Sequence, residues 1–144
     1  MQSKISGSVP AWRQHLMRVL FLLNFISLAP DNWSKVLFPT EALSPMMGVA
    51  IGFYAAFSML CLLAIRFPLK FTPLLLIQLL YKTSWLLAVY YPAYTNANVD
   101  DNLSSWFWVM APGILIDILI IPWGFVYREY LKEFFRIRKE LRPL

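Results

Sequence analysis

Charged residues, cysteine and histidine are scarce in this sequence. Only 15% of the 144 residues are Asp, Glu, Lys or Arg, whereas soluble domains carry about 25%. A single cysteine, Cys61, excludes an intrachain disulfide, and a single histidine, His15, leaves little basis for a metal site or for His-dependent catalysis. We therefore predict no metal site and no catalytic residues, and the sequence points to no particular cofactor. These shortages argue against a disordered chain and against an ordinary soluble domain.

Apolar residues fill the sequence instead: 59% of it is hydrophobic and 17% is aromatic. A helix needs about 20 mostly apolar residues to span a bilayer, and four stretches meet this requirement. The predicted fold class is all-α, an integral membrane four-helix bundle with a C-terminal amphipathic helix. The expected spans cover about residues 13–29, 45–66, 73–91 and 103–121.

Prolines mark the ends of several of these spans. Pro30 is expected to end the first span, and the third is expected to end before Pro92. A cap residue followed by proline opens the second span at residues 44–45 and the third at residues 72–73. The first span also has features of a signal peptide, but Pro30 would follow the cleavage site, so we interpret it as a retained helix.

The basic residues are distributed unevenly between the two sides of the spans. Three precede or begin the first span, two lie in the turn after the second and six lie in the tail, so 11 of the 13 fall on one side. They are Lys4, Arg13, Arg18, Arg66, Lys70, Arg128, Lys132, Arg136, Arg138, Lys139 and Arg142. Because basic loops stay in the cytoplasm, we predict that both termini are cytoplasmic. The net charge of +5 then favours contact with anionic lipid, and we expect no nucleic-acid partner.

The chain is expected to divide after residue 127. Residues 1–127 form the predicted transmembrane domain, and residues 128–144 form a cytoplasmic tail. Apolar side chains recur among the charges of the tail near helical spacing, which predicts an amphipathic helix. Such a helix either lies on anionic lipid or docks a protein partner.

Small residues recur every four positions in the second span, at Gly48, Gly52 and Ala56. Lipid tails are as apolar as leucine, so helices in a bilayer associate through close packing and polar contacts. We expect this small-residue stripe to pack against another span of the same chain. Self-association through the stripe is the alternative.

Two formal charges fall in the middle of the spans, Lys82 in the third and Asp117 in the fourth. Measured from the outer ends of these spans at Tyr91 and Trp106, they lie nine and eleven residues deep, so their depths differ by about 3 Å. A lone charge at the centre of a bilayer costs at least about 2.5–3.5 kcal/mol. The sequence therefore predicts an intramembrane ion pair.

Four further residues belong to this predicted polar site. Gly113 would let the third span approach the fourth, Gln78 extends the polar stripe by one turn, and Asn24 in the first span is within reach of it. Pro112 removes a backbone hydrogen bond and is expected to kink the fourth span. The pair is either a structural device that fixes helix register or a site for a proton, ion or polar ligand. A Lys-bound chromophore is disfavoured, because four spans enclose it poorly.

Residues 65–92 (IRFPLKFTPLLLIQLLYKTSWLLAVYYP) and IPWGFVY at 121–127 resemble a group of uncharacterised small bacterial membrane proteins. The shared features are a basic-Pro-Leu-Lys turn, a Lys-x-x-Trp helix and a late Pro-Trp. The resemblance implies four spans and a bacterial inner membrane, and it supplies no activity. The layout also resembles DoxX-type proteins, in architecture alone.

The function predicted from these features is non-enzymatic: an accessory or scaffold subunit of a larger membrane complex. Its expected partners are the lipid bilayer and either protein subunits or further copies of itself. The alternative is a small transporter or channel that uses Lys82 and Asp117. An enzyme acting on lipid ranks last, because the sequence offers no nucleophile–base pair and no cluster of carboxylates and histidines.

Overall fold

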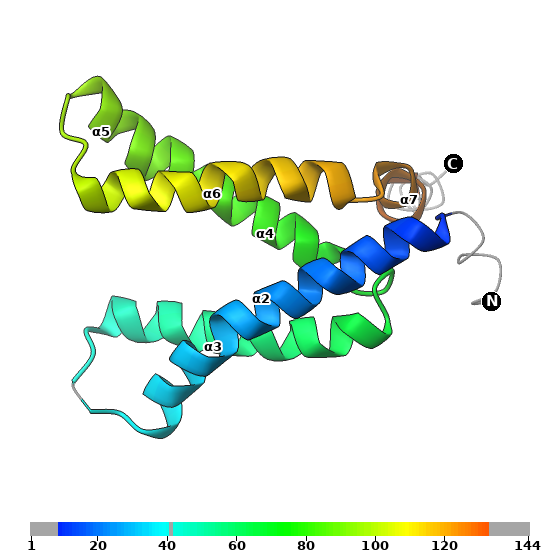
Figure 1. Cartoon of the computed structure of the whole chain (residues 1–144), viewed down its shortest axis with the longest axis horizontal. Coiled ribbons are helices and arrows are strands. Elements are labelled where there is room, and N and C mark those ends of the chain that lie inside the picture. Colours follow the sequence, from blue (N-terminus) through cyan, green and yellow to red (C-terminus); the bar gives the residue numbers. More distant parts are fainter. Residues whose placement is uncertain (1–8, 41, 133–144) are drawn as a thin grey trace, which may run out of the picture.

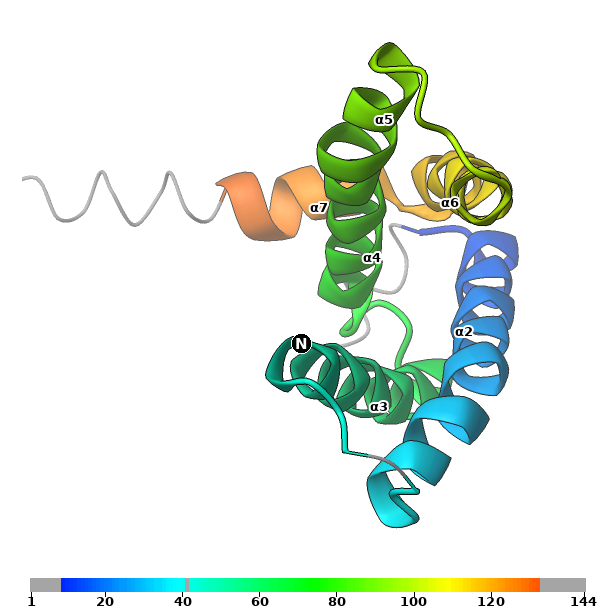
Figure 2. The ribbon, with the colours of Figure 1, turned by 90° about the vertical axis from the view of Figure 1, so that its left-hand side faces the viewer.

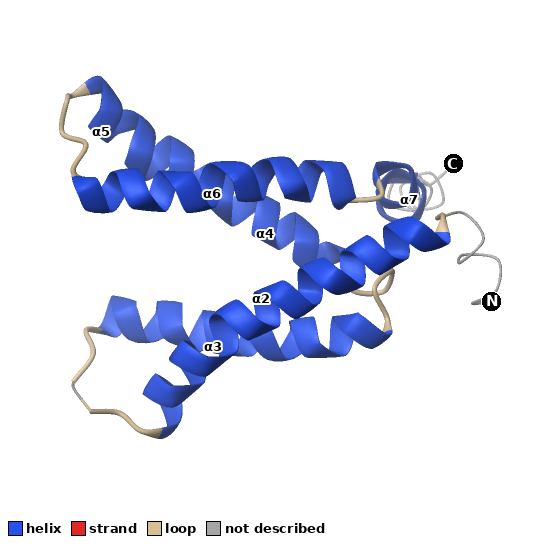
Figure 3. Cartoon of the chain, viewed as in Figure 1, coloured by secondary structure: helices blue, strands red, loops and turns tan. Residues whose placement is uncertain are grey.

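The structure, a computed structural model, describes residues 9–40 and 42–132 of the chain. This part consists of helices and connecting loops and contains no strand (Figure 3). The prediction of an all-α fold is therefore confirmed for these residues.

The first described helix, α2 (Ala11–Leu37), is longer than the predicted span, because Pro30 lies inside it rather than at its end. Proline cannot donate a backbone hydrogen bond, but a helix tolerates this loss when other contacts hold the next turn. Here the Asn32 side chain donates to the Leu28 carbonyl at 2.7 Å, and the Trp33 indole donates to α3. The prediction that Pro30 ends the helix was therefore wrong.

The second helix, α3 (Pro45–Arg66), has the bounds that the sequence predicts. The Ser44 hydroxyl caps it by accepting a hydrogen bond from the Met47 backbone N–H at 3.3 Å, and Pro45 occupies the first turn, where no N–H is needed.

The third helix continues through Pro92, where the sequence suggested an end. It comprises α4 (Thr72–Trp85), a π-helical turn η1 (Leu86–Tyr90) and α5 (Tyr91–Thr95). In the wider turn the Tyr91 N–H donates to the Leu86 carbonyl, five residues back. Because Pro92 has no N–H to donate, this local widening lets the helix pass it without a break.

The fourth long helix, α6 (Asp101–Ile120), begins at Asp100, whose carboxylate accepts from the Leu103 N–H at 2.7 Å. The helix α6 continues through Pro112 as a single helix. After Pro122 the chain turns into α7 (Trp123–Val126) and the π-helical η2 (Tyr127–Lys132). Figure 1 shows α6 from the side and α7 end-on, and Figure 2 shows the reverse, so α7 runs crosswise to α6. Residues 133–144 of the predicted tail lie outside the described residues.

Among the residues that the structure describes, three helices are long and apolar enough to cross a membrane: Pro45–Arg66, Thr72–Thr95 and Asp101–Ile120. The helix α2 is not among them, so three of the four predicted spans have the length and apolar composition that a membrane span requires. Successive helices run in alternating directions, and the start of α2 and the end of α6 lie at the same end of the molecule (Figure 1). We call this the basic end, because Arg13, Arg18 and Arg66 lie in the helices there and Lys70 lies in the turn between α3 and α4.

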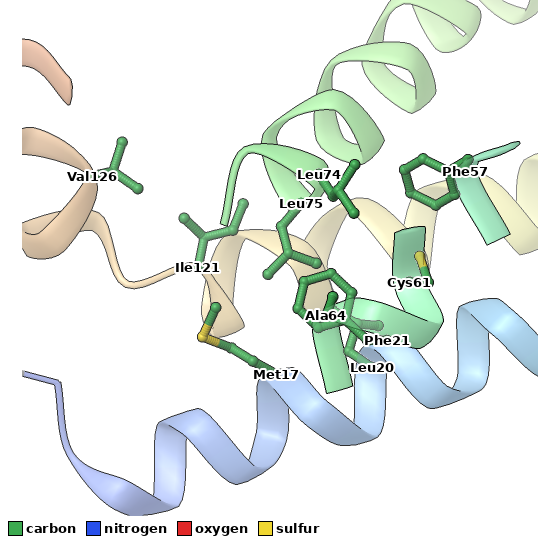
Figure 4. Close-up of a cluster of buried hydrophobic side chains, with 10 residues drawn as sticks. All are labelled: Met17, Leu20, Phe21, Phe57, Cys61, Ala64, Leu74, Leu75, Ile121 and Val126. Atoms are coloured by element: carbon green, nitrogen blue, oxygen red, sulfur yellow. The ribbon is translucent and has the colours of Figure 1, made fainter. Parts of the chain in front are cut away.

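The helices form two pairs, α2 with α3 and α4–α5 with α6, which meet at the basic end and diverge toward the other (Figure 1). The hydrophobic core occupies the meeting point (Figure 4). Its buried members are Met17, Leu20, Phe21, Phe57, Cys61, Ala64, Leu74, Leu75, Ile121 and Val126. Away from this end no residue between 83 and 109 is buried. The two pairs are thus packed together over only part of their length.

The predicted small-residue stripe of α3 does not make the expected contact within the chain. A Cβ atom added at Gly48 or Gly52 would meet nothing within 4 Å, and Ala56 is exposed. The face that α3 buries is rotated by one residue, about 100°. It contains Ile51, Ala55, Ser58, Cys61 and Ala64. The intrachain prediction for the stripe was therefore wrong, because an adjacent face of α3 takes the contact.

Candidate functional site: a polar stripe across three helices

The helix α4 carries two polar residues on one face, Gln78 and Lys82, four positions apart. Both are buried, with 2% and 7% of their surface exposed. Gln78 meets α2, and Lys82 meets α6. The stripe thus links one helix from each pair through α4.

The structure brings Lys82 and Asp117 together. The Lys82 Nζ atom donates to Asp117 Oδ2 at 2.9 Å, and the two side chains are 9% and 0% exposed. Of the 20 residues of α6, only Met110 and Asp117 are buried. The acidic residue in the middle of this apolar helix is thus turned inward, where it meets Lys82.

Gly113 makes room for the lysine side chain. A Cβ atom at this position would lie 2.8 Å from Lys82 Nζ and 3.2 Å from its Cε. The lysine stem therefore passes directly over the glycine, one helical turn from the carboxylate it contacts. Any larger residue would displace the ammonium group from its present position.

Only one of the two carboxylate oxygens of Asp117 has a hydrogen-bond partner among the described residues. Its Oδ2 atom accepts from Lys82, whereas Oδ1 is buried and accepts no hydrogen bond from any residue in the described part of the chain. A buried polar atom without a hydrogen-bond partner is energetically unfavourable and is rare in native proteins. This oxygen has the capacity to accept a hydrogen bond from a water, a proton carrier or a polar ligand.

One turn along α4, Gln78 and Asn24 form a reciprocal amide pair. Asn24 Nδ2 donates to Gln78 Oε1 at 2.7 Å, and Gln78 Nε2 donates to Asn24 Oδ1 at 3.1 Å. Each amide thereby satisfies one donor and one acceptor of the other. The pair gives α2 and α4 a fixed register without any net charge.

The remaining sequence candidates lie apart from the stripe. His15 is in the first turns of α2, where its Nδ1 atom lies 3.5 Å from Nη1 of Arg18. Within residues 9–40 and 42–132, no group of three or more His, Cys, Asp or Glu residues is arranged to hold a metal ion. The helix α6 runs through Pro112 without an interruption, so the predicted kink does not break the helix.

Sequence reasoning missed one polar contact between α2 and α3. The Trp33 indole N–H donates to the Ala55 carbonyl and to the Ser58 hydroxyl, both at 3.2 Å, and that hydroxyl in turn donates to the same carbonyl at 2.7 Å. No sequence signal pointed to it, because a helix that ended at Pro30 would have left Trp33 in a loop.

Comparison of the chain with protein-family models, with curated proteins and with solved structures gives no match. The resemblance to small bacterial membrane proteins therefore stays a prediction.

Proposed function

We propose that this protein is a non-enzymatic subunit of a larger membrane complex, in which it serves as an accessory or scaffold component. The observation that supports this proposal is the divergence of the two helix pairs. No residue between 83 and 109 is buried, so about half of the α4–α5/α6 pair is left uncovered by the other helices of the described chain. Because close packing is what holds helices together in lipid, such a surface suits the helices of another subunit.

The side chains on this surface fit that role. Trp108 is 71% exposed and Val109 is 64% exposed, both in the half of α6 that lies away from the basic end. Trp106 and Tyr94 are exposed near them. Large aromatic residues supply much contact area and are common anchors of protein interfaces. In this reading the Lys82–Asp117 pair is structural and sets the register of α4 against α6.

The proposal includes an orientation. All four long helices cross the membrane, with α2 as the fourth span and both termini in the cytoplasm of a bacterium. The 27 residues of α2 extend about 40 Å, which is sufficient to cross a bilayer, and its side facing away from α3 exposes Val19, Leu23 and Ile26. The charges of the basic end support the cytoplasmic assignment.

Purification in a gentle detergent, followed by mass determination of the intact particle, tests the proposal. A partner present in fixed stoichiometry is expected. The substitution Val109→Phe should release this partner, whereas Leu119→Phe, on the same exposed helix near the basic end, should retain it. A particle that contains only this chain, as a monomer or homo-oligomer, would contradict the accessory role.

One observation favours a second function, a small transporter or channel. The free Oδ1 atom of Asp117 lies inside the protein beside an ammonium group, which is a suitable arrangement for a proton or ion in transit. Reconstitution into liposomes that contain a pH-sensitive dye tests it. Proton flux above that of empty liposomes, abolished by Asp117→Asn, would favour transport; flux that survives this substitution would exclude a role for the pair.

A further inference from the structure

A hollow of about 370 Å³ lies at the basic end of the molecule. It is bounded by the first turns of α2, by the turn that joins α3 to α4 and by the α7–η2 segment. Three cationic side chains line it, Arg18, Arg66 and Lys70, together with one carboxylate, Glu129. Apolar and aromatic side chains, among them Phe67 and Phe125, complete the wall.

The charges of the hollow do not neutralise one another. Within residues 9–40 and 42–132 the ion pairs are Lys35–Asp31 and Lys82–Asp117, and neither involves a residue of the hollow. Lys70 is instead held over the Phe67 ring, with its Nζ atom 5.4 Å from the ring centroid. Counted over the described residues, three cations and one carboxylate leave the hollow with two positive charges in excess.

A second hollow, of about 340 Å³, shares two of these cations. It is lined by Arg18 and Arg66 together with Leu62 and Ile65 of α3. Leu62 lies one helical turn before Arg66, which is the last residue of the span, so this second hollow extends from the charged rim toward the apolar part of the helix. The two arginines therefore line both hollows, at the boundary between them.

We propose that these two adjoining hollows bind an anionic phospholipid whose headgroup carries two phosphates, as in cardiolipin. The headgroup occupies the larger hollow, and the acyl chains leave it along Leu62 and Ile65. Two phosphodiesters match the two uncompensated positive charges, and the fork of an arginine guanidinium suits phosphate oxygens. Basic hollows at the ends of spans lie at the depth of lipid headgroups, and this is where such lipids are recognised.

Tyr130 adds a neutral donor to the same wall. Burial, with a smaller contribution from the Glu129 carboxylate, raises the pKa of its phenol. The hydroxyl therefore keeps its proton at neutral pH and presents an O–H group to a phosphate. The proposed lipid site depends on membrane insertion of the chain, and it does not depend on the accessory role.

Native mass spectrometry of the purified full-length protein, titrated with defined lipids, tests this site. We expect cardiolipin to bind about tenfold more tightly than phosphatidylglycerol, which has one phosphate, and far more tightly than phosphatidylcholine. Arg18→Gln and Arg66→Gln should each remove about tenfold of the cardiolipin affinity, the usual effect of losing one charge-assisted hydrogen bond.

The matched control is Arg128→Gln, which removes the same charge at the same end of the molecule. Arg128 donates to the Gly124 carbonyl and does not line either hollow, so its loss should leave cardiolipin binding unchanged. If Arg66→Gln fails to fold, as judged by circular dichroism, Lys70→Gln in the exposed turn replaces it.

Three results would overturn the proposal. Equal affinity for the three lipids would show that the hollow does not select anionic headgroups. An equal loss from Arg128→Gln would show that net charge alone attracts the lipid. Displacement of cardiolipin by inorganic phosphate at millimolar concentration would identify free phosphate as the preferred ligand.

Discussion

Removing one partner of the Lys82–Asp117 pair should destabilise the fold strongly. The substitution Lys82→Met leaves Asp117 fully buried, with neither carboxylate oxygen bonded, because Lys82 is the one partner that the structure gives it. Breaking a buried pair in this way costs about 3–5 kcal/mol. The substitution Asp117→Leu should cost somewhat less, about 2.5–3.5 kcal/mol, because the remaining ammonium sits on a flexible stem that can move toward a more polar region.

The double substitution separates the coupling energy between the two charges from the cost of replacing each side chain alone. With both charges removed, no uncompensated group remains, so the double variant should be more stable than the sum of the single losses by at least about 2 kcal/mol. The cycle also subtracts the cost of fitting a larger leucine in place of aspartate, since this cost appears in both branches.

Reversible unfolding in mixed micelles, or steric trapping in bicelles, measures the four free energies of unfolding. A coupling energy below about 0.5 kcal/mol would be within the additivity of independent sites and would refute the reasoning. A matched control is the exposed pair Lys35–Asp31, at 2.7 Å but with side chains 47% and 66% exposed, for which a coupling of about 0.5 kcal/mol or less is expected.

Four further outcomes follow from the same contacts. Gly113→Ala should lower the free energy of unfolding by about 1–3 kcal/mol, because the added Cβ would collide with the Lys82 ammonium group. The loss should be smaller in a Lys82→Ala background, where that group is absent. Equal losses in both backgrounds would contradict the close approach. Trp33→Phe should cost about 0.6–1.7 kcal/mol by deleting the indole donor to α3, again measured by unfolding. Gly52→Ala should leave stability unchanged or slightly raised, since its Cβ would enter open space, and a loss would mean that the stripe is packed. Deleting residues 130–144 should leave the spans inserted, as judged by protease protection of the loops, whereas loss of insertion would show that the tail is needed for it.

The pattern of apolar stretches and of charge was sufficient to predict the helices and the two mid-span charges. Helix content follows from the bilayer itself, because a chain in lipid has to satisfy its own backbone hydrogen bonds. The Lys82–Asp117 contact followed from the high energy of a lone charge at that depth, which left each residue with one acceptable neighbour. Neither inference required knowledge of how the helices pack.

The positions of the helix ends could not be predicted from proline. Pro30 and Pro92 both look like terminators, yet the chain stays helical through each of them. After Pro30 the Asn32 side chain bonds to the Leu28 carbonyl of the same helix and the Trp33 indole bonds to α3, whereas before Pro92 the helix widens into a π-helical turn. The Trp33 contact depends on a neighbour that is distant in sequence, and the π-helical turn is a departure from regular α-helix that helix propensity does not describe.

The rotation of α3 about its own axis was decided by the tertiary structure alone. In α3 two small faces lie about 100° apart, one through Gly52 and one through Ala55, and either would allow a close approach by a neighbouring helix. The indole of Trp33 reaches the second face and bonds there to Ser58, which fixes the choice. In an apolar helix every face has nearly the same affinity for lipid, so hydropathy sets which residues enter the membrane, and a few polar contacts set which of them meet.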